Sequence, residues 1–216
     1  MSKLRVLNFG ISLDGYVAGP NQSLDAGLGE GGEDLHQWMF DTRTWRQEVG
    51  QEGGTTGVDD RNIAAGIEGI GAHIMGRNMF GPIRGEWGDS DWSGWWGDDP
   101  PYHHDVFVLT HHAHDPIPMA GGTTFHFVTE GIEVALERAM ASADGQDVRL
   151  GGGCAVVQQY LAAGLVDELH LAYAPILLRG GERLFADGVT VPDGYEVAEL
   201  VSGEGQVAHA RIVRSA

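Results

Sequence analysis

Three consecutive glycines lie between a predicted buried strand and a predicted amphipathic helix, in the stretch VRLGGGCAVVQQYL at 148–161. The first N–H groups of a helix that follows a strand have no partner within the helix, so they can bind an anion. A diphosphate must come within hydrogen-bond distance of these groups, and a Cβ atom would hold it off. Gly151, Gly152 and Gly153 therefore favour a diphosphate site. The alternative is a tight turn that needs a positive φ, which one or two glycines would satisfy.

A second corner of the same kind lies in HIMGRNMFG, residues 73–81. Gly76 ends a predicted strand, and Arg77 stands where the next turn begins. A guanidinium can hold a phosphate through two parallel hydrogen bonds, so Arg77 would supply positive charge that the acidic chain otherwise lacks. The alternative is an ordinary surface arginine or an ion-pair partner.

Cys154 and the histidines have two interpretations each. The Cys154 thiol begins a helix, where its pKa can fall, but the sequence places no base beside it, which favours a small residue that fits near phosphate. The pairs His103–His104 and His111–His112 flank a six-residue strand and would lie roughly 20 Å apart at about 3.3 Å per residue. One metal site cannot use both pairs, so we expect no metal.

Four tryptophans lie in a segment at 85–101 that has no helix or strand period. Such a segment reads as a loop or a lid. Its indole rings could form an aromatic wall over a flat substrate, or they could cover apolar surface beneath the loop or at a dimer contact. The sequence favours neither interpretation.

The composition limits the classes of protein to which this chain can belong. The 216 residues are 42% hydrophobic and 20% charged, which is ordinary for a globular chain, and we expect one domain over 1–216. A net charge of −18 gives no basic footprint for nucleic acid. The single cysteine excludes an internal disulfide framework. The short apolar run near the N-terminus resembles a strand rather than a signal peptide or a membrane span, so we expect a cytoplasmic protein.

Hydrophobic periodicity predicts strands that alternate with helices. We expect a helix at 33–49, where Leu35, Met39 and Thr42 form a weak stripe, and another that carries Ile63, Ile67 and Ile70. Further helices are expected at 131–142 and after the glycines. The helix after the glycines should end near Gly164 and should turn inward the side chains of Val156, Val157, Tyr160 and Leu161. The expected strands are 4–13, 72–76, 105–110, 123–129, 147–151, 167–175 and the hairpin 195–203 with 206–214. This order predicts a three-layer α/β fold with a mostly parallel central sheet and an antiparallel C-terminal hairpin.

Four segments carry a resemblance to a known family: ISLDGYVAGP at 11–20, HIMGRNMFG at 73–81, VFVLTHH at 106–112, and the long block from Leu150 to Phe185. Their order and spacing resemble the dihydrofolate-reductase-like family that includes the C-terminal reductase domain of the riboflavin-biosynthesis deaminase-reductase. The resemblance implies an NADPH-dependent reductase and a homodimer. A zinc deaminase domain is not expected, because its Cys-x-x-Cys ligand pair cannot come from one cysteine.

The resemblance also implies which residues hold the cofactor. The nicotinamide would be bordered by Gly10, Ile11, Val17 and Ala18. Phosphate would be held by Gly76, Arg77, Asn78 and Met79. The adenosine 2′-phosphate would lie by Thr110 and His111, where relatives often have serine or arginine and this chain has imidazoles that change charge near neutral pH. The diphosphate would be bound by Gly151, Gly152, Gly153, Cys154 and Ala155.

A hydride acceptor also needs a proton. It could come from water or from Asp14, which follows the first strand. Dihydrofolate reductase itself has a carboxylate that faces the pterin, and Asp41 is the nearest candidate, with Asp59 and Asp60 as alternatives. The sequence favours a helix cap or a solvated residue for each of the three. We therefore expect hydride transfer from NADPH to a small heterocyclic or carbonyl substrate, pterin or riboflavin-precursor-like. The alternative is a non-catalytic protein of the same fold that binds a nucleotide or a heterocycle.

Overall fold

The computed structural model describes residues 2–81, 85–88, 91–185 and 193–215. The strands are β1 (Leu4–Ser12), β2 (Tyr16–Ala18), β3 (Ile70–Gly76), β4 (Asp105–Leu109), β5 (Ile117–Pro118), β6 (Thr124–Val128), β7 (Asp147–Gly152), β8 (Glu168–Ala174), β9 (Glu182–Arg183), β10 (Tyr195–Ser202) and β11 (Ala208–Arg214). The helices are α1 (Gln37–Phe40), α2 (Arg43–Glu48), α3 (Val58–Ala65), α4 (Arg77–Phe80), α5 (Ile132–Ser142), α6 (Cys154–Ala162) and the 3-10 helices η1 (Gly32–His36) and η2 (Ala120–Gly122).

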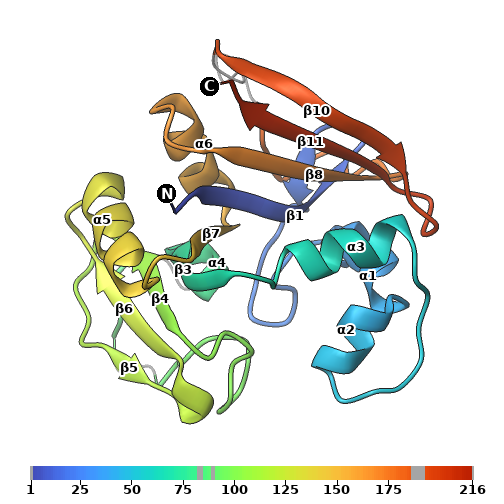
Figure 1. Ribbon diagram of the computed structural model, residues 1–216. Coiled ribbons are helices and arrows are strands. Elements are labelled where there is room, and N and C mark those ends of the chain that lie inside the picture. Colours follow the sequence, from blue (N-terminus) through green and yellow to red (C-terminus); the bar gives the residue numbers. More distant parts are fainter. Residues whose placement is uncertain (1, 82–84, 89–90, 186–192, 216) are drawn as a thin grey trace.

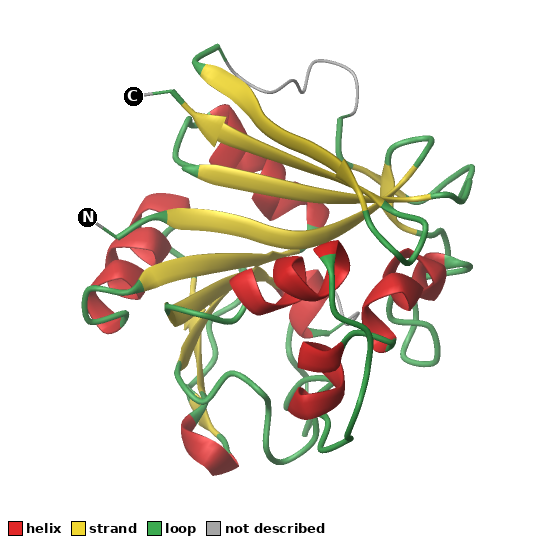
Figure 2. Cartoon of the chain, turned by 45° about the vertical axis from the view of Figure 1, so that its right-hand side comes forward, coloured by secondary structure: helices red, strands yellow, loops and turns green. Residues whose placement is uncertain are grey.

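One nine-stranded sheet organises the molecule, in the order β10-β11-β8-β1-β7-β3-β4-β6-β5 (Figure 1). Every pair from β8 through to β6 is parallel, whereas β10 with β11, β11 with β8, and β5 with β6 are antiparallel. Helices cover both faces of the sheet (Figure 2). The predicted three-layer α/β fold with an antiparallel C-terminal hairpin is confirmed.

The larger core lies between the sheet and the helices α5 and α6. Val148 and Leu150 alternate along β7 and point into this core, as does the stripe Val156, Val157, Tyr160 and Leu161 of α6. The Tyr160 hydroxyl donates a 2.7 Å hydrogen bond to the Ile132 carbonyl, so this buried phenol has a partner. The inward stripe predicted for α6 is therefore correct.

On the other face, the single helix predicted at 33–49 is wrong. The segment folds as η1, α1 and α2, with a break at Asp41 and Thr42. Thr42 is fully buried and extended, and its hydroxyl accepts a hydrogen bond from the Trp45 N–H at 3.3 Å, so it starts a new helix as an N-cap. Leu35 and Trp38 still reach a second core with Ile63 of α3.

The helix α3 is shorter than predicted. It ends at Ala65, so Ile67 lies beyond it with 39% of its surface exposed, and Ile70 is the first residue of β3. The apparent helical spacing of three isoleucines therefore spans a helix, a turn and a strand.

A chain of buried polar groups links β1 to the C-terminal hairpin. The backbone N–H of Asn8 donates to His170 Nδ1 at 3.1 Å, so His170 Nε2 is the donor to His209 Nδ1 at 3.0 Å. His209 Nε2 then donates to Asp59 Oδ1 at 2.7 Å, and the Gly205 N–H donates to Asp59 Oδ2 at 2.5 Å. Asp59 is 2% exposed and accepts both of these bonds, so it serves the fold; it is neither the helix cap nor the solvated residue that the sequence suggested, and it does not line the cavity.

The segment at 85–101 forms neither helix nor strand in the part that the structure describes. Trp87, Trp92 and Trp96 pack against a third apolar cluster that includes Phe80 and Phe125. The segment is therefore held to the sheet by buried aromatic contacts. Across the described residues, no helix combines the length and apolarity that a membrane crossing requires.

We predict that Asp59→Ala destabilises the protein by roughly 2–5 kcal/mol, because it leaves the His209 N–H and the Gly205 N–H buried without an acceptor. The matched control is Asp60→Ala on the next residue of α3, which removes a single bond from the Thr44 N–H and should cost about 1 kcal/mol. Urea unfolding of both variants measures the two losses. Equal losses would contradict the role assigned to Asp59.

Candidate functional site

A cavity of about 860 Å³ lies where the ends of β1, β3 and β7 face the helices η1 to α3 and the tryptophan segment. The residues that line it come from four places: β1 and the loops that follow it, the segment from η1 to α3, the region between β3 and β4, and the turn from β7 into α6. Those used below are Asn8, Phe9, Gly10, Val17, Ala18, Gln22, Asp25, Glu33, His36, Glu48, His73, Asn78, Met79, Trp95, Trp96, Tyr102, His104, Arg149, Gly151, Gly152, Gly153, Cys154 and Glu182.

The three glycines of the β7 corner, which we call the glycine corner (Gly151–Gly153), meet different constraints. A Cβ at Gly151 would lie 3.2 Å from Met79 Cε, which is a tight contact. Gly152 has a φ of +142°, a conformation that residues with a Cβ rarely adopt. A Cβ at Gly153 would meet nothing within 4 Å. Gly153 lines the cavity and caps α6, so its lack of a side chain leaves room for a ligand beside the first turn.

Cys154 follows the glycine corner as the first residue of α6. Burial and the nearby Glu182 carboxylate raise the pKa of the Cys154 thiol to about 12. The thiol therefore stays protonated near neutral pH, and the structure favours a small packing residue over a nucleophile.

Gly10 lies where β1 meets η1. A Cβ there would lie 3.0 Å from both His36 Cε1 and the Leu35 carbonyl oxygen, so only glycine permits this approach. The imidazole of His36 therefore stands beside the residue expected to border a nicotinamide. Burial is the main cause that lowers the pKa of His36 to about 4, and the positive charge of Arg149 adds to it.

The structure brings most of the predicted cofactor residues to the cavity, namely Gly10, Val17, Ala18, Asn78, Met79, Gly151, Gly152, Gly153 and Cys154. Ile11 is instead 1% exposed and belongs to the main core. Gly76 and Ala155 belong to the corners but do not line the cavity; a Cβ at Gly76 would lie 2.8 Å from Val156.

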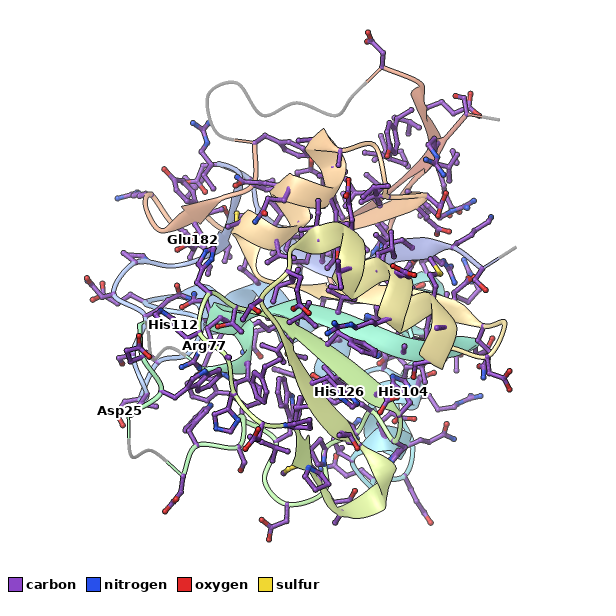
Figure 3. All side chains as sticks on the ribbon, turned by 90° about the vertical axis from the view of Figure 1, so that its left-hand side faces the viewer. Asp25, Arg77, His104, His112, His126 and Glu182 are labelled. Atoms are coloured by element: carbon purple, nitrogen blue, oxygen red, sulfur yellow. The ribbon has the colours of Figure 1, made fainter. Side chains whose placement is uncertain are left out.

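Arg77, Thr110 and His111 also lie outside the cavity. The guanidinium of Arg77 lies over the Trp87 ring, 3.1 Å from its centroid, and its three nitrogens are buried without a hydrogen-bond partner among the residues that the structure describes. The Trp87 indole N–H donates to the His112 carbonyl at 2.8 Å, so Trp87 joins the ends of β3 and β4, where Figure 3 labels Arg77 and His112 near each other. The Thr110 hydroxyl is engaged with the backbone of His112.

Asp14, the predicted proton donor, and Asp41, the predicted carboxylate that faces a pterin, do not line the cavity. The Asp14 carboxylate accepts hydrogen bonds from the Ser12 hydroxyl and the N–H groups of Leu178 and Arg179, and these bonds lower its pKa. It therefore ties two loops together as a carboxylate. Asp41 pairs with Arg46 at 2.8 Å, with 78% of its side chain exposed. Their positions in sequence were near the site, but their side chains point to other partners.

Sequence analysis missed a polar cluster made by His73, Tyr102, His104 and Arg149 in the cavity wall. His73 and Arg149 alternate with apolar residues in β3 and β7, so they face away from the α5 and α6 core. That alternation is the signal in the sequence that could have found them. Within the described ranges, no three His, Cys, Asp or Glu side chains are grouped as metal ligands would be.

Comparison with known proteins agrees with this architecture. The family model described as the RibD C-terminal domain matches residues 5–198. A search of curated proteins finds no match.

Solved structures share the fold at low sequence identity. A Shewanella sp. PV-4 protein whose name refers to riboflavin biosynthesis has 21% identity and a TM-score of 0.60, with full coverage of both chains. A pyrimidine reductase-like protein from Corynebacterium diphtheriae has 15% identity and a TM-score of 0.51, with 100% of this chain and 92% of that chain covered.

A diaminohydroxyphosphoribosylaminopyrimidine deaminase/5-amino-6-(5-phosphoribosylamino)uracil reductase from Thermotoga maritima has 11% identity and a TM-score of 0.55. The alignment covers 99% of this chain but 56% of that one. The predicted resemblance is confirmed by the family model, which spans most of the sequence. The chain belongs to the RibD C-terminal domain family.

Proposed function

We propose that this protein is an NADPH-dependent oxidoreductase that reduces a small heterocyclic or carbonyl substrate of the pterin or riboflavin-precursor type. The observation that carries the proposal is the glycine corner, which opens on a large cavity at the ends of parallel strands. Ligands of open α/β sheets bind at this edge. Family membership supports the same reaction class.

The glycine corner offers a dinucleotide both open space and backbone N–H groups. The space beside Gly153 is open, and the backbone there begins α6, whose first N–H groups lack helical partners. Gly10, Val17 and Ala18 line the neighbouring wall and would border the nicotinamide, with Gly10 allowing His36 to approach. When bound, the cofactor supplies the hydride; the protein positions the two reactants and limits their contact with water.

The charge of Glu182 opposes a diphosphate at this corner, since Glu182 lines the cavity close enough to raise the pKa of the Cys154 thiol. Binding of the diphosphate at this corner then depends on hydrogen bonds from the backbone. Because Asp14 and Asp41 lie outside the cavity, we propose that water supplies the proton.

We predict that Gly153→Val weakens NADPH binding by about tenfold or more, equivalent to about 1.4 kcal/mol, because its side chain would fill the space that the diphosphate needs. Its φ of −56° and open surroundings permit a side chain, so thermal stability should fall only slightly, because valine is a poorer N-cap than glycine. Calorimetric titration with NADPH measures the effect. Ala163→Val, at the exposed far end of the same helix, is the control.

The same preparation tests catalysis. Wild-type protein is mixed with NADPH and a panel of pterin, flavin-precursor, quinone and aldehyde compounds, and the absorbance of the reduced nicotinamide is followed. Oxidation with one class identifies the substrate type. Binding of NADPH without oxidation across the panel would favour a non-catalytic nucleotide-binding protein, and absence of binding would overturn the proposal.

We predict that Arg77→Ala weakens NADPH binding by about tenfold, about 1.4 kcal/mol, and NADH binding by much less. Within the described part of the chain, the buried nitrogens of Arg77 have no hydrogen-bond acceptor, and although burial lowers the pKa of Arg77 to about 10, the guanidinium stays charged at neutral pH. A 2′-phosphate would supply the missing acceptor. Parallel titrations with both dinucleotides check this, with Arg138→Ala on α5 as the control. Equal losses would remove Arg77 from 2′-phosphate recognition.

We further propose that two copies associate through the face of β10. A register shift between Val197 and Glu199 puts Val197 and Leu200 opposite Ile212 and Ala210, on one face of the hairpin. Val197 is 65% exposed and Leu200 is 71% exposed, whereas Ile212 packs against the main core. The apolar face of the hairpin therefore extends from the core onto the exposed side chains of Val197 and Leu200, and a symmetric second copy of the chain would cover it.

We predict that Leu200→Lys shifts the protein from dimer to monomer in light scattering, because a charge would then be buried at the contact. Glu196→Lys, a charge change at an exposed position of the same strand, should leave the dimer intact. A wild-type protein that is monomeric at all concentrations tested would contradict the proposed dimer.

A further inference from the structure

The cavity has a second end whose chemistry differs from that of the glycine corner. We call it the arginine end, and it consists of His73, Tyr102, His104 and Arg149. His73 and Arg149 are register partners on neighbouring strands, so their side chains leave the sheet side by side on the same face. His73 Nδ1 lies 2.6 Å from His104 Nε2, and the Tyr102 ring is edge-on to His73. In Figure 3, His104 lies well away from Asp25 and Glu182, which also line the cavity.

Arg149 carries a charge that no carboxylate of the described chain neutralises directly. Its NH1 and NH2 groups donate to the carbonyls of Gly66 at 2.9 Å and Leu7 at 3.1 Å, and its Nε is buried without a partner. Arg5, its register partner on β1, is by contrast paired with Glu168 at 3.1 Å and Asp147 at 3.4 Å. Among the described residues, Arg149, which lines the cavity, therefore has no acidic partner, whereas its neighbour Arg5 has two.

The groups around Arg149 are neutral and can donate hydrogen bonds, His73 in the tautomer in which Nδ1 accepts from His104 and Nε2 carries the proton. Burial holds the pKa of His73 well below its usual value, with a further contribution from Arg149, so His73 is uncharged at neutral pH. Burial also raises the pKa of the Tyr102 hydroxyl, which therefore keeps its proton. Among described residues, neither the Tyr102 hydroxyl nor the His36 ring has a hydrogen-bond partner, and both residues line the cavity.

We propose that the arginine end binds the anionic group of a planar heteroaromatic substrate, and that this group is a single carboxylate. An unpaired guanidinium with neutral N–H and O–H donors beside it suits a carboxylate, which accepts several charge-assisted hydrogen bonds. This inference rests on the proposed function, since it names the substrate class of the same cavity.

The remaining lining residues favour a flat monoanion. Phe9, Trp95 and Trp96 contribute aromatic rings to the wall, and such rings suit a planar ligand. Four carboxylates, those of Asp25, Glu33, Glu48 and Glu182, also line the cavity and repel negative charge. A phosphate ester with close to two charges would be repelled more strongly than a carboxylate with one.

The test compares two fluorescent probes that share one ring system, pterin-6-carboxylate and pterin, by fluorescence titration at about pH 6.5, where a carboxylate is ionised. Wild-type protein should bind pterin-6-carboxylate about tenfold more tightly than pterin, about 1.4 kcal/mol. In Arg149→Met the two affinities should become equal, because the charge is lost. In Arg149→Lys, which keeps the charge, part of the preference should remain.

Arg138→Met is the matched control, since it removes the same charge from α5, and should keep the wild-type preference. The wild-type comparison decides the question even where Arg149→Met fails to fold. Equal binding of the two probes, or no binding of pterin-6-carboxylate, overturns the arginine end as a carboxylate site. Calorimetry with NADPH is read separately, so a protein that prefers the carboxylate but binds no dinucleotide contradicts the reductase and not this inference.

Discussion

Hydrogen-bonded pairing of β7 between β1 and β3 is the interaction on which the rest of the site depends. It places Arg149 beside both Arg5 and His73, and it directs Val148 and Leu150 into the opposite core. Side chains alternate along a strand, so a slip of one residue would bury the guanidinium among leucines and valines and expose the apolar set. The cost of such a slip specifies the register.

The glycine corner combines structural and functional demands in three adjacent residues. Gly151 and Gly152 are explained by the fold, because one packs tightly against Met79 and the other has a positive φ. Gly153 has neither constraint, yet it opens on the cavity at the start of α6. A turn alone would therefore account for two of the three glycines, and the third is left for a ligand to explain.

The charged side chains of this acidic protein serve different purposes. Asp14 and Asp59 accept hydrogen bonds that join distant segments, which removes them from the chemistry of the cavity. Arg77 and Arg149 differ from these aspartates, since each has at least one buried nitrogen with no hydrogen-bond acceptor among the described residues, in a chain of net charge −18. Buried unpaired cations are costly, and anionic ligands at the two places would offset that cost.

The sequence by itself determined the α/β class, the order of strands and helices, the family and the glycine corner, because periodicity and glycine placement are local signals. The helix predicted at 33–49 is wrong because a buried hydroxyl at Thr42 caps a new helix there. The predicted stripe of isoleucines is wrong because α3 ends at Ala65. Only the tertiary structure decided that Arg149, His73 and His36 share a cavity while Asp14 and Ile11 do not. The reason is that strand register brings together residues far apart in the sequence, such as His36 and Arg149, which are 113 positions apart, and register is not encoded in local spacing.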